Sequence, residues 1–152
     1  MVELVLPNDA NTMGNVLGGR VLHWIDLAAA IVAHRHCRTE AVTASMDEVS
    51  FLAPIRVGQL AVIAARMTFV GRSSMEIRVD VQSEDLMSGE RKQTSTAYLT
   101  FVAVDKNGCP AAVPPLLYET EDEKREARAA EARRAKRLQS RLLETPREIK
   151  QR

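Results

Sequence analysis

The sequence has almost no net charge, few cysteines and no long hydrophobic run. Its 152 residues carry 21 Lys and Arg against 20 Asp and Glu, so the total charge does not indicate a nucleic-acid or membrane-surface protein. No apolar run reaches the roughly 18 residues of a membrane span, and the N-terminus lacks the basic start and apolar centre of a signal peptide. We therefore expect a cytoplasmic protein with neither a nucleic-acid nor a membrane partner.

Several common catalytic and cofactor motifs are also missing. The chain has no G-x-S-x-G elbow, P-loop or dinucleotide fingerprint, so serine-nucleophile, kinase and dehydrogenase functions have no support. Cys37 and Cys109 have no metal-type spacing and no adjacent base, and we interpret them as inert thiols. His34 and His36 have no acidic or cysteine partner at ligand spacing, so no metal site is expected.

The segment from residue 7 to 36 is the most unusual part of the chain. A loop rich in Asn, Asp and Gly runs into residues 21–33, an apolar stretch whose only polar side chains are His23 and Asp26. Apolar residues at helical spacing predict a helix over about residues 17–38. Because no face of this helix is clearly polar, we expect it to lie in the middle of the molecule.

Beyond residue 38 the hydrophobic period becomes two, which predicts successive strands. We expect them at residues 42–54, 60–70, 75–82 and 93–104, after a short first strand at residues 2–6. The 60–70 strand is apolar on both faces, as is typical of a central strand, whereas 75–82 alternates like a half-exposed one. Short turns predict an antiparallel sheet, and a sheet curled around the helix gives an α+β domain.

The C-terminal part of the chain has a different composition. Three prolines within residues 110–115 mark a boundary, and we place the main domain at residues 1–117. Residues 118–144 are predicted to form a charged helix with acids near its start and bases near its end, as the helix dipole favours. Its thin apolar stripe indicates either light packing on the body or contact with another subunit. A disordered tail is expected over residues 145–152.

Asp26 is the sharpest candidate for chemistry. Its helical neighbours Ala29, Ala30 and Ala33 are small, which leaves room for a ligand, a water or another backbone. A carboxylate in such a place can serve as a general base. An alternative of equal standing is a structural carboxylate that is hydrogen-bonded to a neighbouring strand or paired with His23.

Asn11 and the glycines of the preceding loop are weaker signals. Taken singly they indicate an ordinary turn that leads into a helix. Their placement adds a functional interpretation, because Gly18 and Gly19 leave unobstructed amides at a helix start, where an anion or a developing oxyanion can bind.

A second turn carries a possible phosphate site. Gly71, Arg72, Ser73 and Ser74 combine a cation, two hydroxyls and backbone donors, although a plain hairpin turn is the favoured interpretation of this stretch by itself. Lys92 either adds to such a site or is simply solvated.

Taken in order, these motifs resemble the acyl-coenzyme A thioesterases of the hot-dog fold. The pattern P-x-D-x-N-x-x-G-x-x-x-G-G begins at Pro7 and is followed on the predicted helix by an acid, Asp26. Further matching segments are TASMDEVSFLAPI at residues 43–55, GRSSM at 71–75 and FVAVD at 101–105. The resemblance covers about residues 4–117. Relatives often carry an aromatic within the stretch matching residues 15–17, so their acyl-chain preference does not transfer.

The resemblance implies a long central helix wrapped by a curved antiparallel sheet, with active sites at the interface of two protomers. Asp26 would activate a water or attack the thioester, and Asn11 of the opposite protomer would orient the water or the thioester. The amide near Gly19 would polarise the carbonyl, with Gly18 close to it. The turn from Gly71 to Ser74, with Lys92, would hold the pantetheine-phosphate end. The implied protein is a homodimer, assembled as a trimer of dimers, that hydrolyses acyl-CoA without a metal or redox cofactor.

Three other functions fit the sequence less well than hydrolysis does. A non-catalytic acyl-CoA sensor on the same fold would not need Asn11 and Asp26 together. A hydratase or dehydratase of the same fold uses a paired acid and histidine, and neither His23 nor His34 stands at the expected spacing from Asp26. A scaffold assembled through the charged C-terminal helix leaves Asp26 unexplained.

Overall fold

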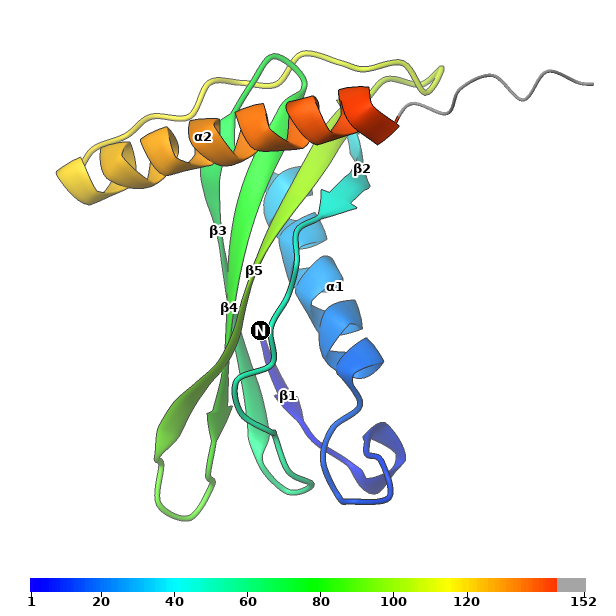
Figure 1. Ribbon diagram of the computed structural model, residues 1–152, viewed down its shortest axis with the longest axis vertical. Coiled ribbons are helices and arrows are strands. Elements are labelled where there is room, and N and C mark those ends of the chain that lie inside the picture. The colour runs from blue at the N-terminus through cyan, green and yellow to red at the C-terminus, as the bar shows by residue number, and fades with distance from the viewer. Residues whose placement is uncertain (145–152) are drawn as a thin grey trace, which may run out of the picture. The chain divides into compact units, whose positions relative to one another are not determined.

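The computed structural model describes residues 1–144, and the chain divides into two compact units after Leu116. The first unit contains five strands and the long helix α1 (Gly18–Cys37), and the second contains the helix α2 (Glu121–Glu144) (Figure 1). The tail expected at residues 145–152 lies outside the described residues.

The first unit is one antiparallel sheet curled around α1 (Figure 1). Its strands are β1 (Val2–Leu4), β2 (Glu40–Met46), β3 (Leu60–Val70), β4 (Ser74–Glu84) and β5 (Arg91–Val104). They lie in the order β1-β3-β4-β5-β2, so β1 and β2 form the two edges. The expected α+β architecture, with a long helix wrapped by an antiparallel sheet, is confirmed.

Helix α1 is buried along one side only. Ile25, Ala29 and Ala33 are fully buried against the inner face of the sheet. Every second residue of β4 and β5 points to this face, and most of these residues are buried and apolar. Leu27 and Ile31, on another side of the helix, are each 43% exposed. The sequence-based expectation of a helix in the middle of the molecule therefore holds for one face, and an apolar face stays uncovered within the protomer.

The strand predicted over residues 42–54 is too long, because β2 ends at Met46. The N–H of Asp47 still donates to the carbonyl of Tyr98, at 2.9 Å, and the chain then leaves β5. It returns only where the N–H of Leu52 donates to the carbonyl of Thr94, at 2.8 Å, beside a register irregularity between β4 and β5. Apolar residues in this segment line a cavity instead of joining the ladder.

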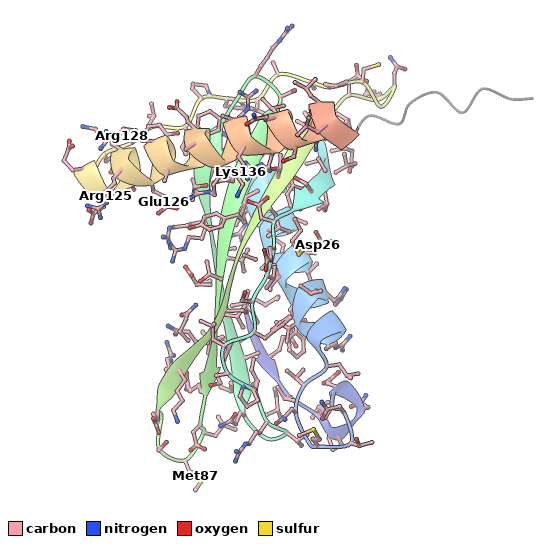
Figure 2. All side chains as sticks on the ribbon, viewed as in Figure 1. Asp26, Met87, Arg125, Glu126, Arg128 and Lys136 are labelled. Atoms are coloured by element: carbon pink, nitrogen blue, oxygen red, sulfur yellow. The ribbon has the colours of Figure 1, made fainter. Side chains whose placement is uncertain are left out.

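Two further expectations about the sheet need correction. The middle strand is β4, not β3, and β4 is more deeply buried than its alternating sequence indicates. The polar stretch before residue 93 is largely strand, because β4 extends to Glu84 and β5 begins at Arg91. Asp85 closes the turn between them by accepting the N–H of Met87, labelled in Figure 2, at 3.0 Å.

Helix α2 begins at Glu121, three residues later than the predicted start at 118, and a capping box sets this boundary. The N–H of Glu123 donates to the hydroxyl of Thr120 at 3.2 Å, and the N–H of Thr120 donates to the Glu123 carboxylate at 3.0 Å. Lys124 and Glu121 pair within the helix at 2.8 Å. Neither α1 nor α2 is long and apolar enough to cross a membrane.

A cluster of charged side chains lies on the face of the sheet that points away from α1. Asp80 accepts hydrogen bonds from Arg78 (2.9 Å), Arg66 (3.3 Å) and Thr96 (2.8 Å). Burial by itself would raise the pKa of Asp80, but the hydrogen bonds from Arg78 and Thr96, together with the two guanidinium charges, lower the pKa below its ordinary 3.8. The cluster joins β3, β4 and β5 across the sheet.

We predict that Asp80→Asn lowers the free energy of unfolding by about 1 kcal/mol at neutral pH, a value reduced for partial exposure. Because the folded-state pKa is lowered, this contribution is complete above the unfolded value and is lost as the pH falls through the folded value. Urea unfolding should therefore show a difference from wild type that narrows in acid. Glu48→Gln, at an exposed carboxylate outside the cluster, serves as the control. A difference independent of pH would contradict this role.

Candidate active site

The loop before α1 is shaped by the side chain and backbone of Asn11. The Asn11 side-chain oxygen accepts the N–H groups of Met13 (3.0 Å) and Asn15 (3.2 Å). Gly14, at a φ of 77° that favours glycine, donates its N–H to the Asn11 carbonyl at 3.0 Å. With the amide oxygen engaged, the Asn11 NH₂ group is the part that can serve a ligand, and it can only donate.

Asp9, two residues earlier, clamps this loop to the first turns of α1. Its buried carboxylate pairs with the Arg20 guanidinium at 2.9 Å, and its carbonyl accepts the N–H of Leu17 at 2.9 Å. The Arg20 guanidinium also lies 5.5 Å from the centre of the Trp24 ring. Asp9 is not among the site residues predicted from the sequence, although the pattern P-x-D-x-N, which contains it, is a signal for a role.

The start of α1 presents unpaired backbone donors. Leu17 caps the helix in extended conformation, with no side-chain hydrogen bond to the first turn. Arg20 and Val21 return their N–H groups to the Leu17 carbonyl, whereas those of Gly18 and Gly19 find no acceptor within the described part of the chain. A Cβ atom on Gly19 would meet no atom within 4 Å, so the space beside its Cα is open.

Asp26 lies in the middle of α1 and is partly exposed (Figure 2). The hydroxyl of Thr43, on the edge strand β2, donates to one Asp26 carboxylate oxygen at 2.8 Å. The other oxygen has no partner among residues 1–144, and His23 is exposed and makes no contact with this carboxylate there. Of the structural alternatives, the bond to a neighbouring strand is therefore present and the His23 pair is not.

Thr43, which contacts Asp26, is not among the site residues predicted from the sequence. It opens the TASMD stretch, which was noted only as part of the resemblance. Its hydroxyl holds one oxygen of the Asp26 carboxylate and leaves the other without a partner among residues 1–144. Local periodicity does not predict this contact, because the two residues are 17 positions apart and meet only where the helix packs beside the strand.

The turn at residues 71–74 joins β3 to β4. The N–H of Gly71 donates to the Ser74 carbonyl at 2.8 Å, and a Cβ on Gly71 would come within 2.8 Å of the Ser74 hydroxyl oxygen. A larger residue at position 71 would make the Ser74 side chain rotate away, whereas the nearest backbone atom, the Ser74 carbonyl oxygen, would be at an ordinary 3.7 Å. Ser73 accepts the N–H of Ala103 with its carbonyl, which anchors the turn to β5, and the Arg72 side chain is exposed.

Lys92 does not lie near this turn within one protomer. It is paired in register with Ser83, at the far end of β4 from Ser74, which corresponds to a separation of roughly 30 Å along the strand. Its ammonium group lies 3.5 Å from the Glu90 carboxylate. Within one protomer, Lys92 and residues 71–74 cannot hold the same phosphate group.

A long helix wrapped by an antiparallel sheet, with unpaired amides at the helix start and a carboxylate further along, is the arrangement expected of a hot-dog thioesterase domain. The thioesterase superfamily model matches residues 13–90, and the chain belongs to this superfamily. The chain is 49% identical over 119 residues to an uncharacterised acyl-CoA thioester hydrolase of Bacillus subtilis, covering 78% of this chain and 69% of the relative.

Solved structures agree with this family. A hexameric acyl-CoA thioesterase superposes with a TM-score of 0.88 at 42% identity, over 92% of this chain and 90% of that one. An acyl-CoA hydrolase from Staphylococcus aureus, solved with butyryl coenzyme A, coenzyme A and coenzyme A disulfide, has a TM-score of 0.83 at 35% identity, over 94% and 90% of the two chains. The expected hot-dog fold and family are thus confirmed.

The Staphylococcus aureus enzyme has also been solved as three alanine variants, of an aspartate, an asparagine and a threonine. In that enzyme the asparagine lies 15 positions before the aspartate, and the threonine lies 17 positions after it. Asn11 and Thr43 stand at the same two distances from Asp26 in this chain.

We predict that Asp9→Ala loosens the Asn11 loop. The loss of the carboxylate removes the ion pair with Arg20 and should lower the free energy of unfolding by about 1–2 kcal/mol. The expected loss is no larger because Arg20 lies partly in water, which weakens the pair. Hydrogen exchange should become faster for the amides of residues 11–16 than for those of β4. Asn8→Ala, at the exposed neighbouring position, is the control. Unchanged loop exchange in Asp9→Ala would show that the clamp is not needed.

Proposed function

We propose that this protein hydrolyses acyl-CoA thioesters to a free carboxylic acid and coenzyme A, at a site shared by two protomers. The main support is that α1 carries unpaired amides at Gly18 and Gly19 and, further along, an accessible carboxylate at Asp26 with one oxygen unpartnered in the described chain. The relatives named above are thioester hydrolases, and the spacing of Asn11, Asp26 and Thr43 matches the three residues substituted in one of them.

The distance along α1 is the reason for assigning the site to two protomers. Seven residues separate Gly19 from Asp26, which corresponds to about 10 Å of helix axis. A thioester carbonyl bound at the Gly19 amide is then too far from Asp26 of the same helix for direct attack by a water held there. A second protomer, related by two-fold symmetry and joined at the uncovered side of α1, would place its Asp26 opposite the amides of the first.

In the proposed reaction, the free Asp26 oxygen accepts a proton from a water that attacks the thioester carbonyl carbon. The carbonyl oxygen gains negative charge, which the Gly18 and Gly19 amides stabilise as hydrogen-bond donors. The carbon–sulfur bond then breaks, the carboxylic acid forms, and coenzyme A leaves as its thiol after taking up the proton. In the second route, the same oxygen attacks the carbonyl carbon directly, the carbon–sulfur bond breaks and coenzyme A leaves as its thiolate. Water then hydrolyses the resulting anhydride, which releases the carboxylic acid, regenerates the Asp26 carboxylate and supplies the proton for the thiolate.

Asn11 is proposed to act as a donor from the protomer opposite Asp26. Its side-chain oxygen is already engaged by Met13 and Asn15, so its NH₂ group would bind the attacking water or the thioester oxygen. Asp9 holds the loop in place for this task. Asn11 is therefore assigned to orientation and charge stabilisation, and proton transfer is assigned to Asp26.

Coenzyme A is proposed to lie with its pantetheine-phosphate end near residues 71–74, where the Arg72 side chain is exposed. Lys92 would reach the same molecule only from the other protomer, or contact a different part of it. The chemistry requires no metal or redox cofactor, because Asp26 supplies the base and backbone amides polarise the carbonyl.

The proposed assembly is a homodimer, and three such dimers form a hexamer. The hexameric acyl-CoA thioesterase described above supports this number of subunits. We assign the protein to the cytoplasm, a reducing compartment in which Cys37 and Cys109 would stay unpaired, as they are here.

Mixing two inactive variants tests the shared site. Asp26→Ala and Asn11→Ala should each lower kcat at least 100-fold with little change in KM. A mixed dimer of the two retains one site with both native residues, so an equimolar mixture refolded together should recover roughly a quarter of wild-type activity. Free thiol release from acyl-CoA is the measurement. Mixed protein no more active than the parents would place both residues in one protomer's site.

Thr43 provides an independent test of how Asp26 is held. Thr43→Val keeps the shape of the side chain but removes the hydroxyl, and it should lower kcat roughly tenfold or more while KM stays near its wild-type value. Thr43→Ser restores a hydroxyl and should recover most of the rate. Steady-state kinetics on acyl-CoA separates the two parameters. Equal rates for the Val and Ser variants would remove Thr43 from the site.

A further inference from the structure

A cavity of about 210 Å³ opens beside the start of α1. Its walls are mainly apolar, and Gly18 reaches its edge. The apolar residues that matter most are Val16, Val21, Phe51, Ala53 and Ile55. No part of the mechanism above uses this cavity.

The cavity is held open by backbone hydrogen bonds between its walls. The N–H of Val16 donates to the Ile55 carbonyl at 2.8 Å, which ties the Asn11 loop to the segment after β2. The N–H of Leu52 donates to the Thr94 carbonyl at 2.8 Å, which ties that segment to β5. Thr94 turns its hydroxyl proton to the Val81 carbonyl at 2.9 Å and so offers no free donor to the cavity. The space is thus preformed and suited to an apolar group.

The position of the cavity follows from the geometry of a thioester. The carbonyl carbon bears the oxygen, the sulfur and the first carbon of the acyl chain. That first carbon is two bonds away from the carbonyl oxygen. When the oxygen is bound at the Gly18 and Gly19 amides, the acyl chain therefore begins close to the start of α1. Gly18 borders both the amide site and the cavity, so an apolar chain that leaves the carbonyl can pass directly between its walls.

In the proposed function an acyl chain that leaves the carbonyl enters this cavity, and we propose that Phe51, together with Ala53, sets the chain length that is accepted. The inference rests on the proposed function. Phe51 is 49% exposed, and its ring lies 3.6 Å from where a Cβ on Gly18 would sit, so it forms the side of the entrance. Val21 and Ile55, both 2% exposed, close the inner end.

Two variants of the full-length protein test this in opposite directions. Ala53→Leu places a larger side chain in the cavity and should lower the ratio of kcat/KM for hexanoyl-CoA to that for acetyl-CoA roughly tenfold or more. Phe51→Ala removes one wall and should raise the ratio for lauroyl-CoA to hexanoyl-CoA by about tenfold. Leu52→Ala is the matched control, because Leu52 lies between the two, is 74% exposed and does not line the cavity.

The measurement is kcat/KM from thiol release for acetyl-, butyryl-, hexanoyl-, octanoyl- and lauroyl-CoA. Chain profiles of Ala53→Leu and Phe51→Ala that coincide with those of wild type and Leu52→Ala would overturn the inference while leaving the proposed hydrolysis intact. A wild-type protein that releases no thiol from any of the five would instead defeat the proposed function. If Ala53→Leu fails to fold, the half-exposed Phe51 site still decides the matter.

Discussion

The packing of one side of α1 against the inner face of the sheet is the constraint on which the rest of the structure depends. Ile25, Ala29 and Ala33 have no exposed surface, and the two alanines let the helix approach the sheet closely. This contact sets the rotation of the helix about its axis. Successive residues are about 100° apart, so Asp26 emerges at the margin of the contact, beside the edge strand β2. A different rotation would bury the carboxylate without a partner, at considerable cost.

The same packing leaves the polar groups of the site accessible in a single protomer. An unpaired backbone amide or carboxylate oxygen is costly only when it is withdrawn from water. The Gly18 and Gly19 amides and the free Asp26 oxygen avoid this cost because they lie at the protomer surface. The uncovered apolar face with Leu27 and Ile31 lies on the same helix. A second protomer on this face would exclude water from the Gly18 and Gly19 amides and from the Asp26 carboxylate. A bound substrate would then take the place of the water as their hydrogen-bond partner.

The error in the sequence-based strand assignment concerns the segment that builds the cavity. Residues 47–55 contain enough apolar side chains to indicate a continuing strand, yet the chain leaves β5 and touches it again only through Leu52. Phe51 and Ala53 then face a cavity at the start of α1 instead of a neighbouring strand. An apolar residue in a sequence indicates that its side chain is buried, but it does not indicate whether the side chain contacts a neighbouring strand, a helix or a ligand.

The sequence by itself determined the α+β class, the antiparallel order of long strands and the position of α1, because local periodicity and turn residues control these features. It also identified Asn11, Gly19 and Asp26 as candidates, through unusual placement and through resemblance. Only the tertiary structure revealed the Asp26–Thr43 bond, the Asp9–Arg20 clamp, the two backbone N–H groups that engage the Asn11 side-chain oxygen and the separation of Lys92 from residues 71–74. Most of these depend on contacts between segments distant in the chain, on the register of the sheet or on the folded path of a loop. Such contacts arise when the helix and sheet pack together, and no pattern within one segment encodes them.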